Sequence, residues 1–440
     1  MSWELLSIIL LAVMAVSLLI GQWIAFALGV AGIVVIVLSK GLLGLSTISS
    51  IVWNTTNSYL LISIPLFLLM GEIMLRTGVN EYFYRGMGSL LKWLPGGLMH
   101  ANIGACALFA AICGSSVATA ATIGTVAIPQ LLRRGYDRRM VFGSIAGGGT
   151  LGILIPPSIP FILYGALVDE SVARLFMAGV VPGLLLTAMF STYIVVRTII
   201  DPALAGSHAR NTAPVEDAAD DQGSELVKIL HVLPIVALLS VVLGGIYTGI
   251  ATPTESAAIG VAGALILGVS YGRLTRAACH AALMSTIRTT GMVMLIVISA
   301  QILSAALSFS GVSRGLSEMI YNLGLTKWEF FAALVVLYVV LGCFVEGIAM
   351  IYITLPVLYP VIQKFGFNPI WFGVILVVLI EVGQIHPPLG LNLFTIKSIA
   401  PDSDFKEIVM GALPYVLIVL SLILILALFP QLALWLPSAM

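Results

Sequence analysis

Charged residues are scarce in this chain of 440 residues, because Asp, Glu, Lys and Arg make up only 9% of it. Soluble proteins carry roughly 25% charged residues. Hydrophobic residues make up 60%, and the mean hydropathy is +1.11. The chain is therefore predicted to be an all-α polytopic membrane protein that contacts the lipid bilayer. Its formal net charge of +0 gives no bulk attraction to nucleic acid, so no nucleic-acid partner is expected.

Cysteine and histidine are sparse as well. The 4 cysteines are scattered through apolar runs, unlike a disulfide framework or a metal site. The 5 histidines show no ligand spacing, so no transition metal and no cofactor are expected. The ATP-binding sequence Gly-x-x-x-x-Gly-Lys-[Ser/Thr] does not occur. Residues 1–16 lack the basic region and cleavage site of a signal peptide, and they are predicted to begin a membrane helix.

Long apolar runs fill most of the chain. Runs of about 17–25 residues can cross a bilayer as helices. Crossings are predicted near residues 4–20, 22–38, 52–75, 139–168, 175–198, 229–250, 253–270, 283–309, 367–398 and 407–435. The acidic stretch 201–228 is predicted to be a solvated linker between residues 1–200 and 229–440. Segments 78–94 and 312–326 mix charged and apolar residues and are predicted to be interfacial helices.

Two apolar stretches, 98–132 and 328–363, are too long for one crossing and are interrupted at their centres. The first contains Cys113 followed by Gly-Ser-Ser, and the second contains Glu346 followed by Gly347. Two half-length helices around a polar tip form a re-entrant hairpin, which is the favoured interpretation. Two short and poorly hydrophobic crossings are the alternative.

Basic residues predict the orientation. With the N-terminus outside, five of the 20 Lys and Arg fall outside and the other 15 fall inside, which follows the positive-inside rule. The five outside residues are Lys40, Arg174, Arg314, Lys327 and Lys364. Both termini are therefore predicted outside, with the 201–228 linker in the cytoplasm.

An internal repeat relates the two halves. A shift of 231 residues places Gly152 on Gly383 and Pro156-Pro157 on Pro387-Pro388. The same shift aligns Gly29 with Gly260, Gly32 with Gly263, Pro129 with Pro360 and Gly135 with Gly366. Each copy contains five predicted crossings and one hairpin. Since five is odd, the second copy is predicted to run upside down, as in secondary transporters built from inverted repeats.

The repeated pattern Gly-x-x-x-Pro-Pro lies inside an apolar run in each copy, within 147–160 and 382–390. Glycine weakens a helix and proline removes a backbone donor, so each run is predicted to be a broken helix. Broken backbone at membrane depth is tolerated only inside protein or beside a wet cavity. Freed carbonyls, with Ser and Thr hydroxyls, are oxygen ligands for sodium.

The candidate cation ligands therefore come from the hairpin tips and the breaks, one set per copy. They are Cys113, Ser115, Ser116, Gly152, Leu154 and Pro157 in the first, and Gly347, Gly383, Ile385 and Pro388 in the second. The alternative is that these small residues only let helices pack closely. Weaker candidates for substrate contact are Thr119, Tyr164, Glu346, His386, Asn392 and Thr395.

Four acidic residues lie within apolar runs, where an unpaired charge is costly. Glu346 lies at a hairpin tip, and Glu381 precedes the second break. Glu255 is interpreted as a helix-start acid, and Glu72 as the partner of Arg76 four residues away. For His386, packing as a neutral imidazole is favoured over contact with an anion.

Five motifs together resemble the DctM-like large membrane subunit of tripartite ATP-independent periplasmic (TRAP) transporters. They are 64–67 with Gly71, 113–120, 148–158, 252–255 and 386–390. The resemblance implies an elevator-type symporter in the bacterial inner membrane that imports a C4-dicarboxylate, sialic acid or similar carboxylate with sodium. It also implies a small four-helix membrane subunit and a soluble periplasmic binding protein as partners. The family commonly has Ser where this chain has Cys113. The change leaves the first site intact if this position contributes only its carbonyl, and removes a ligand if a hydroxyl is needed.

Two other functions are consistent with part of this pattern. A stand-alone anion symporter of similar fold would need no binding protein. An intramembrane enzyme would need paired acids or a His-Asp cluster at one depth, whereas the motifs present are Gly/Pro breaks. No enzyme activity is therefore expected.

Overall fold

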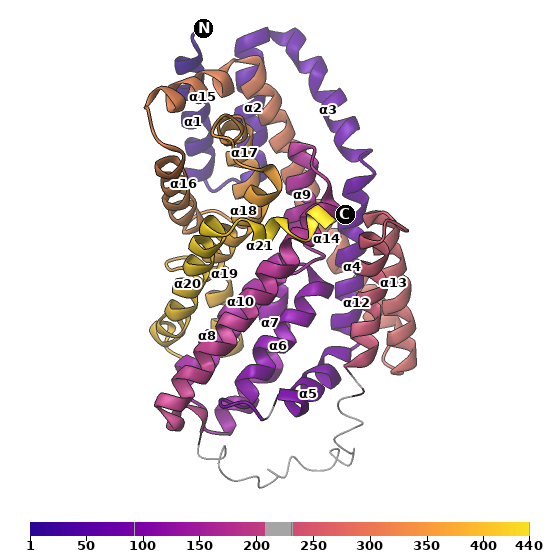
Figure 1. Ribbon diagram of the computed structural model, residues 1–440. Coiled ribbons are helices and arrows are strands. Elements are labelled where there is room, and N and C mark those ends of the chain that lie inside the picture. The colour runs from indigo at the N-terminus through magenta and orange to yellow at the C-terminus, as the bar shows by residue number, and fades with distance from the viewer. Residues whose placement is uncertain (92, 207–229, 231, 440) are drawn as a thin grey trace.

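The computed structural model describes the chain except residues 92, 207–229, 231 and 440, and this described part is all helical (Figure 1). The first half comprises α1 (Trp3–Leu19), α2 (Ile24–Lys40), α3 (Ser46–Thr56), α4 (Ser63–Arg76), α5 (Val79–Leu91), α6 (Leu98–Cys113), α7 (Ser116–Arg133), α8 (Arg138–Leu154), α9 (Ile159–Val168) and α10 (Val172–Ile200). The second half comprises α12 (Leu233–Tyr247), α13 (Pro253–Ser270), α14 (Arg276–Phe309), α15 (Val312–Asn322), α16 (Lys327–Gly342), α17 (Gly347–Lys364), α18 (Pro369–Ile385), α19 (Leu391–Ile399), α20 (Phe405–Leu428) and α21 (Gln431–Leu434).

Several of these helices are long and apolar enough to cross a membrane. Within the described ranges there are 6 such spans when α8 and α9 are taken together, namely Arg138–Val168, Val172–Ile200, Pro253–Ser270, Arg276–Phe309, Gly347–Lys364 and Phe405–Leu428. Shorter apolar helices accompany them, among them α1, α2, α12 and α18. The chain is thus an all-α polytopic membrane protein. The number of crossings stays a prediction, and most of the predicted 201–228 linker lies outside the described residues.

The predicted crossing at 52–75 stays a prediction, but this stretch is not one straight helix. The chain there forms two helical pieces, Leu42–Thr56 and Leu60–Arg76, which meet at a bend of 56°. The polar residues around Asn57 explain the break, because their side chains compete for backbone hydrogen bonds. For example, the Thr56 hydroxyl donates to the Val52 carbonyl at 2.8 Å. Pro65 fits in the first turn of α4, where its missing N–H is not needed.

The two halves use equivalent residues to start their central helices. Gly135 and Gly366, with φ of 76° and 69°, follow the preceding helix in a conformation that favours glycine. Two residues later, Asp137 caps α8 by accepting the Met140 N–H at 2.9 Å. Asn368, 231 residues further on, caps α18 in the same way. The sequence repeat is therefore also a repeat of local structure.

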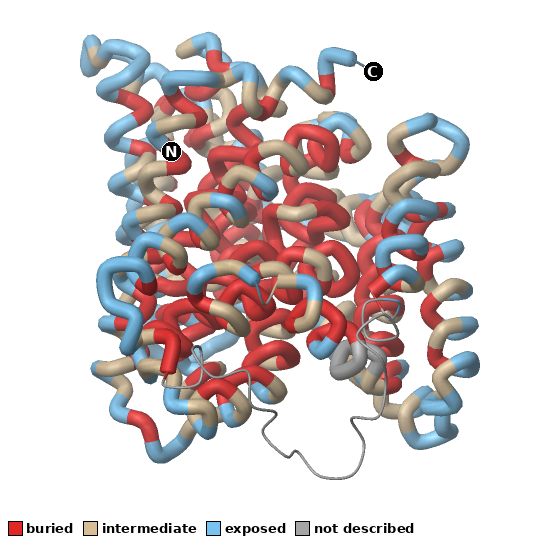
Figure 2. The backbone as a smooth tube through the Cα atoms, turned by 60° about the horizontal axis from the view of Figure 1, so that its bottom comes forward, coloured by how far each residue is buried: buried red, intermediate tan, exposed pale blue. Residues whose placement is uncertain are grey.

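Helices α8 and α18 form the centre of the molecule, and Figure 2 shows the buried residues gathered there. Both are buried over nearly their whole length, and they contact each other. Glycines allow this close packing: Gly143 and Gly147 of α8 leave no room for a side chain against Gly411 and Tyr415 of α20. The hairpin helices α6 and α7 pack against α8, and α16 and α17 pack against α18.

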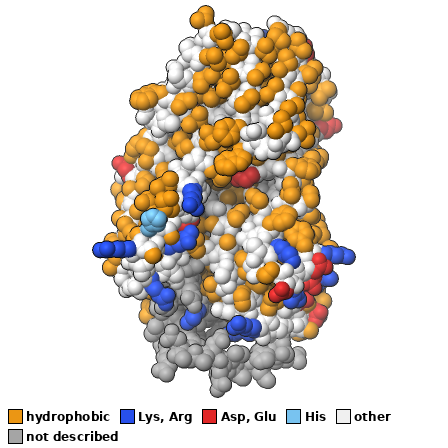
Figure 3. Space-filling model, turned by 180° about the vertical axis from the view of Figure 1, so that it is seen from behind, with side chains coloured by type: hydrophobic (Ala, Val, Ile, Leu, Met, Phe, Trp, Pro, Cys, Tyr) orange, Lys and Arg blue, Asp and Glu red, His pale blue; other side chains and the backbone are white. Residues whose placement is uncertain are grey.

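The surface is apolar over most of the face in Figure 3. On that face the Lys and Arg side chains gather in the lower half of the view. The short helices α5 and α15 lie at opposite ends of the molecule (Figure 1). These positions are those expected of interfacial helices in two halves that run in opposite directions.

Candidate cation site at the helix breaks

The first break separates α8 from α9 at residues 155–158. Pro156 and Pro157 have no N–H, so the carbonyls of Gly152 and Ile153, four residues earlier, lose their helical donors. The hydroxyl of Ser158 donates to the Ile153 carbonyl and replaces one of these donors. The Gly152 carbonyl receives no such replacement in the described part of the chain. The break therefore leaves one free acceptor inside buried protein.

The tip of the first hairpin lies directly against this break. A Cβ on Gly152 would be 2.6 Å from the Ser115 carbonyl oxygen and 2.8 Å from the Thr119 hydroxyl. At Gly114, which turns the tip with φ 59°, a Cβ would be 3.2 Å from the Pro157 carbonyl oxygen. The tip and the break thus bring together several oxygen atoms from two elements. Such an array is the ligand type that suits sodium.

The second half also contributes to the first tip. Asn392 of α19 is fully buried, and its Nδ2 donates to Ser116 Oγ at 2.8 Å and to the Ala146 carbonyl at 3.2 Å. Ser116 Oγ lies 3.1 Å from Asn392 Oδ1. A residue predicted as a weak substrate contact is therefore engaged with the hairpin tip and with α8. Sequence reasoning did not find this pairing, because the two residues are 276 positions apart.

The second break differs in detail from the first. Helix α18 ends at Ile385 and α19 begins at Leu391. Gly383 lies against Gly342 at the end of α16, where its Cβ would be 2.8 Å from the Gly342 Cα. Gly347 instead faces Ile380 and the Gln384 side chain. The predicted ligands Gly383 and Gly347 therefore lie in two different contacts, Gly383 with the end of α16 and Gly347 with α18.

One sequence difference between the two halves also changes the second break. The position equivalent to Ser158 is Leu389, which has no hydroxyl. The carbonyl of Gln384, which loses its donor to Pro388, therefore has no replacement of the kind that Ser158 gives Ile153. At the adjacent tip, Glu346 caps α17 and accepts the N–H of Ile348 at 3.1 Å and of Ala349 at 3.3 Å.

The remaining predicted site residues have local partners. Tyr164 is buried, and its hydroxyl donates to the Pro369 carbonyl at 2.7 Å. The Thr395 hydroxyl donates to the Leu391 carbonyl of its own helix at 2.9 Å. His386 Nδ1 lies 3.2 Å from Cys343 Sγ, a contact that sequence reasoning missed. The Leu154 carbonyl oxygen lies against Gly179 of α10. The ligand role of these residues stays a prediction, and the structure places only some of them at the breaks.

Two acidic residues have the partners predicted for them. Glu72 lies 3.3 Å from Arg76 and also accepts the Ser285 hydroxyl at 2.7 Å. Glu255 forms a capping box with Thr252 at the start of α13, and its carboxylate accepts the Thr252 N–H at 2.8 Å. Both interpretations are confirmed. No group of three or more His, Cys, Asp or Glu that suits a metal ion occurs among the described residues.

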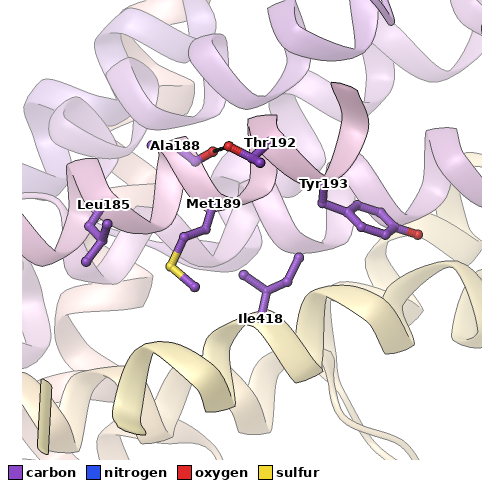
Figure 4. Close-up of a pocket in the computed structure, with 6 residues that line it drawn as sticks. All are labelled: Leu185, Ala188, Met189, Thr192, Tyr193 and Ile418. Atoms are coloured by element: carbon purple, nitrogen blue, oxygen red, sulfur yellow. Dashed lines mark hydrogen bonds between the residues drawn. The ribbon is translucent and has the colours of Figure 1, made fainter. Parts of the chain in front are cut away.

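An apolar pocket lies between α10 and α20 (Figure 4). It is lined by Leu185, Ala188, Met189, Thr192, Tyr193 and Ile418. The Thr192 hydroxyl is used within its own helix, donating to the Ala188 carbonyl at 2.8 Å. The lining offers no cationic group to an organic anion, so this pocket is a poor candidate for the substrate site.

Among polytopic membrane proteins, buried broken helices are typical of secondary transporters. Residues 11–432 match the family model described as the DctM component of the tripartite ATP-independent periplasmic transporters. The chain belongs to this family.

Curated relatives agree with this assignment. The C4-dicarboxylate TRAP transporter large permease protein DctM of Pseudomonas aeruginosa is 35% identical over 88% of each chain. The protein of the same name from Rhodobacter capsulatus is 31% identical over 98% of this chain and 99% of its own. The sialic acid TRAP transporter permease protein SiaT of Haemophilus influenzae is 28% identical over 88% of this chain and 63% of its own.

A solved structure supports the fold. The YdaH transporter of Alcanivorax borkumensis superposes with a TM-score of 0.61 over 95% of this chain and 97% of its own, at 16% sequence identity. At this identity the likeness concerns the fold alone.

Proposed function

We propose that this chain is the transport subunit of a sodium-coupled importer of an organic acid in the bacterial inner membrane. The observation that carries the proposal is the convergence of oxygen atoms from Ser115, Thr119 and the first break. Family membership supports a small membrane subunit and a periplasmic binding protein as partners. The names of relatives support a C4-dicarboxylate, sialic acid or similar carboxylate as substrate.

The movement we propose is of the elevator type. The hairpins and broken helices, α6–α9 and α16–α19, form the moving part, and the remaining helices form the scaffold. The repeat of 231 residues and the opposite positions of α5 and α15 support two inverted halves. Bound sodium would satisfy carbonyls at the breaks and offset the charge of the anion. The membrane potential drives the inward movement of net positive charge with about 2.3 kcal/mol per elementary charge per 100 mV.

Reconstitution tests the proposal. The chain, with its small subunit and binding protein, is placed in proteoliposomes, and uptake of a labelled C4-dicarboxylate or sialic acid is measured. We expect uptake with an inward sodium gradient and no uptake with a proton gradient alone. Uptake that follows the proton gradient and ignores sodium would refute sodium coupling. Equal uptake without the binding protein would favour the stand-alone symporter instead.

The orientation we propose is testable with a native cysteine. Cys279, near the start of α14, is exposed, whereas Cys106, Cys113 and Cys343 are buried. An impermeant maleimide is expected to label Cys279 in inside-out membrane vesicles and not in right-side-out vesicles. The Cys279→Ser variant, as control, is expected to show no label in either kind of vesicle. Labelling of Cys279 only in right-side-out vesicles would reverse the proposed topology.

A further inference from the structure

Helix α18 carries an acidic side chain that has no partner. Glu381 is fully buried, and neither of its carboxylate oxygens has a hydrogen-bond partner within the described chain. Gln384, 7% exposed, likewise has an unpartnered side-chain oxygen. Buried polar atoms are nearly always satisfied in proteins, and leaving a buried charge unpaired is costly. These three orphaned oxygen atoms therefore require an explanation.

The two side chains are neighbours. Residues three apart on a helix lie on one face, so Glu381 and Gln384 are adjacent on α18. The Gln384 amide nitrogen lies 3.5 Å from the Cβ position of Gly347, which places this side chain at the start of α17, beside the second hairpin tip. The main-chain carbonyl of Gln384 also lacks a helical donor, because Pro388 has no N–H. Unpartnered acceptors therefore gather on this part of α18.

The surrounding elements supply no countercharge. Helix α18 contains no Lys, Arg or His, and no salt bridge to Glu381 occurs in the described ranges. Three tyrosines on helices packed against α18 are engaged in other contacts. Tyr338 of α16 pairs with Thr354 at 2.5 Å, Tyr164 of α9 donates to Pro369, and Tyr415 of α20 is packed among aromatic rings.

Two basic residues on helices that contact α18 are engaged elsewhere. Lys397 of α19 donates to the carbonyls of Pro401 and Ser403 at 2.7 Å each. Arg138 at the start of α8 pairs with Glu407 at 3.0 Å. Within the described chain no basic side chain pairs with Glu381, so its charged form requires a cation from solution.

We propose that Glu381 and Gln384 hold a monovalent cation, with sodium as the ion, through the carboxylate and the side-chain amide oxygen. The inference rests on the proposed sodium coupling and gives the second half an anionic ligand. The first half has none at the equivalent position, since Thr150 stands 231 residues before Glu381. The Thr150 hydroxyl donates to the Gly147 carbonyl of its own helix at 2.7 Å and is satisfied. The two halves are therefore proposed to bind their ions with different chemistry.

Thermal unfolding of the purified full chain tests the proposal without any transport assay. A ligand that binds only the folded state raises Tm with its concentration. Tm is measured against sodium chloride, with choline chloride keeping the ionic strength constant. In Glu381→Gln, which keeps the side-chain shape and removes the charge, the sodium concentration for half-maximal stabilisation is expected to rise at least tenfold. In Gln384→Met, of similar volume, it is expected to rise severalfold.

Thr150→Val is the matched control, and its sodium dependence is expected to equal that of the wild type. If Glu381→Gln keeps the wild-type sodium dependence, the proposal is overturned and the acid is held neutral, while the proposed sodium coupling stands. If Glu381→Gln fails to fold, an unchanged sodium dependence in Gln384→Met overturns the proposal. If the wild-type chain itself shows no stabilisation specific to sodium, the proposed sodium coupling fails together with this site.

Discussion

Sodium-dependent uptake is expected to be abolished when Gly152 is replaced by valine. The new Cβ would be 2.6 Å from the Ser115 carbonyl oxygen, which is backbone and cannot turn aside like a flexible side chain. Either the hairpin tip or α8 must shift, at a cost of about 1–3 kcal/mol for an overpacked core. A shift of that kind separates the proposed ligands. The measurement is initial uptake in proteoliposomes as a function of sodium concentration.

The control for this variant is Gly291→Val. Gly291 lies in the middle of α14 at an exposed position, and a Cβ there has nothing within 4 Å. It adds the same side chain to an apolar helix without disturbing a neighbour, so uptake is expected to stay near the wild-type rate. A Gly152→Val protein with the wild-type rate and Hill slope for sodium would show that the first cation site is misplaced.

Replacing Asn392 by alanine is expected to lower the free energy of unfolding by about 2–4 kcal/mol. The change leaves the buried Ser116 hydroxyl and the Ala146 carbonyl without their partner, at about 1–3 kcal/mol for each group. It also releases the first hairpin tip from the second half, so the Hill slope for sodium is expected to fall. The measurements are denaturant unfolding of the purified chain and uptake against sodium.

A double-mutant cycle identifies the cause. The double variant Ser116→Ala/Asn392→Ala is expected to lose less free energy of unfolding than the two single variants lose together. The difference is expected to be at least about 0.5 kcal/mol, because the two side chains share one contact. Ser398→Ala on the same helix is the control. Its exposed hydroxyl bonds only within α19, so its effect is expected within about 0.5 kcal/mol. Strictly additive losses would contradict a direct link between Ser116 and Asn392.

Part of the architecture was determined by the sequence alone. Two consecutive prolines remove two adjacent backbone donors, and α8 and α18 end just before Pro156-Pro157 and Pro387-Pro388. Gly135 and Gly366 end the preceding helices for a similarly local reason. Low charge and long apolar runs fix the membrane class, because they cannot cover a soluble surface. These features depend on backbone chemistry and composition, and both can be read along the chain.

The contacts at the breaks were decided only by the tertiary structure. The apolar run 52–75 predicted one crossing, and only the structure shows that two helical pieces meet there at a bend of 56°. The repeat predicted equivalent sites, yet Gly152 meets Ser115 while Gly383 meets Gly342. The pairing of Asn392 with Ser116 joins residues from different halves. Which oxygen atoms meet depends on how helices distant in sequence pack, and periodicity along the chain carries no information about that packing.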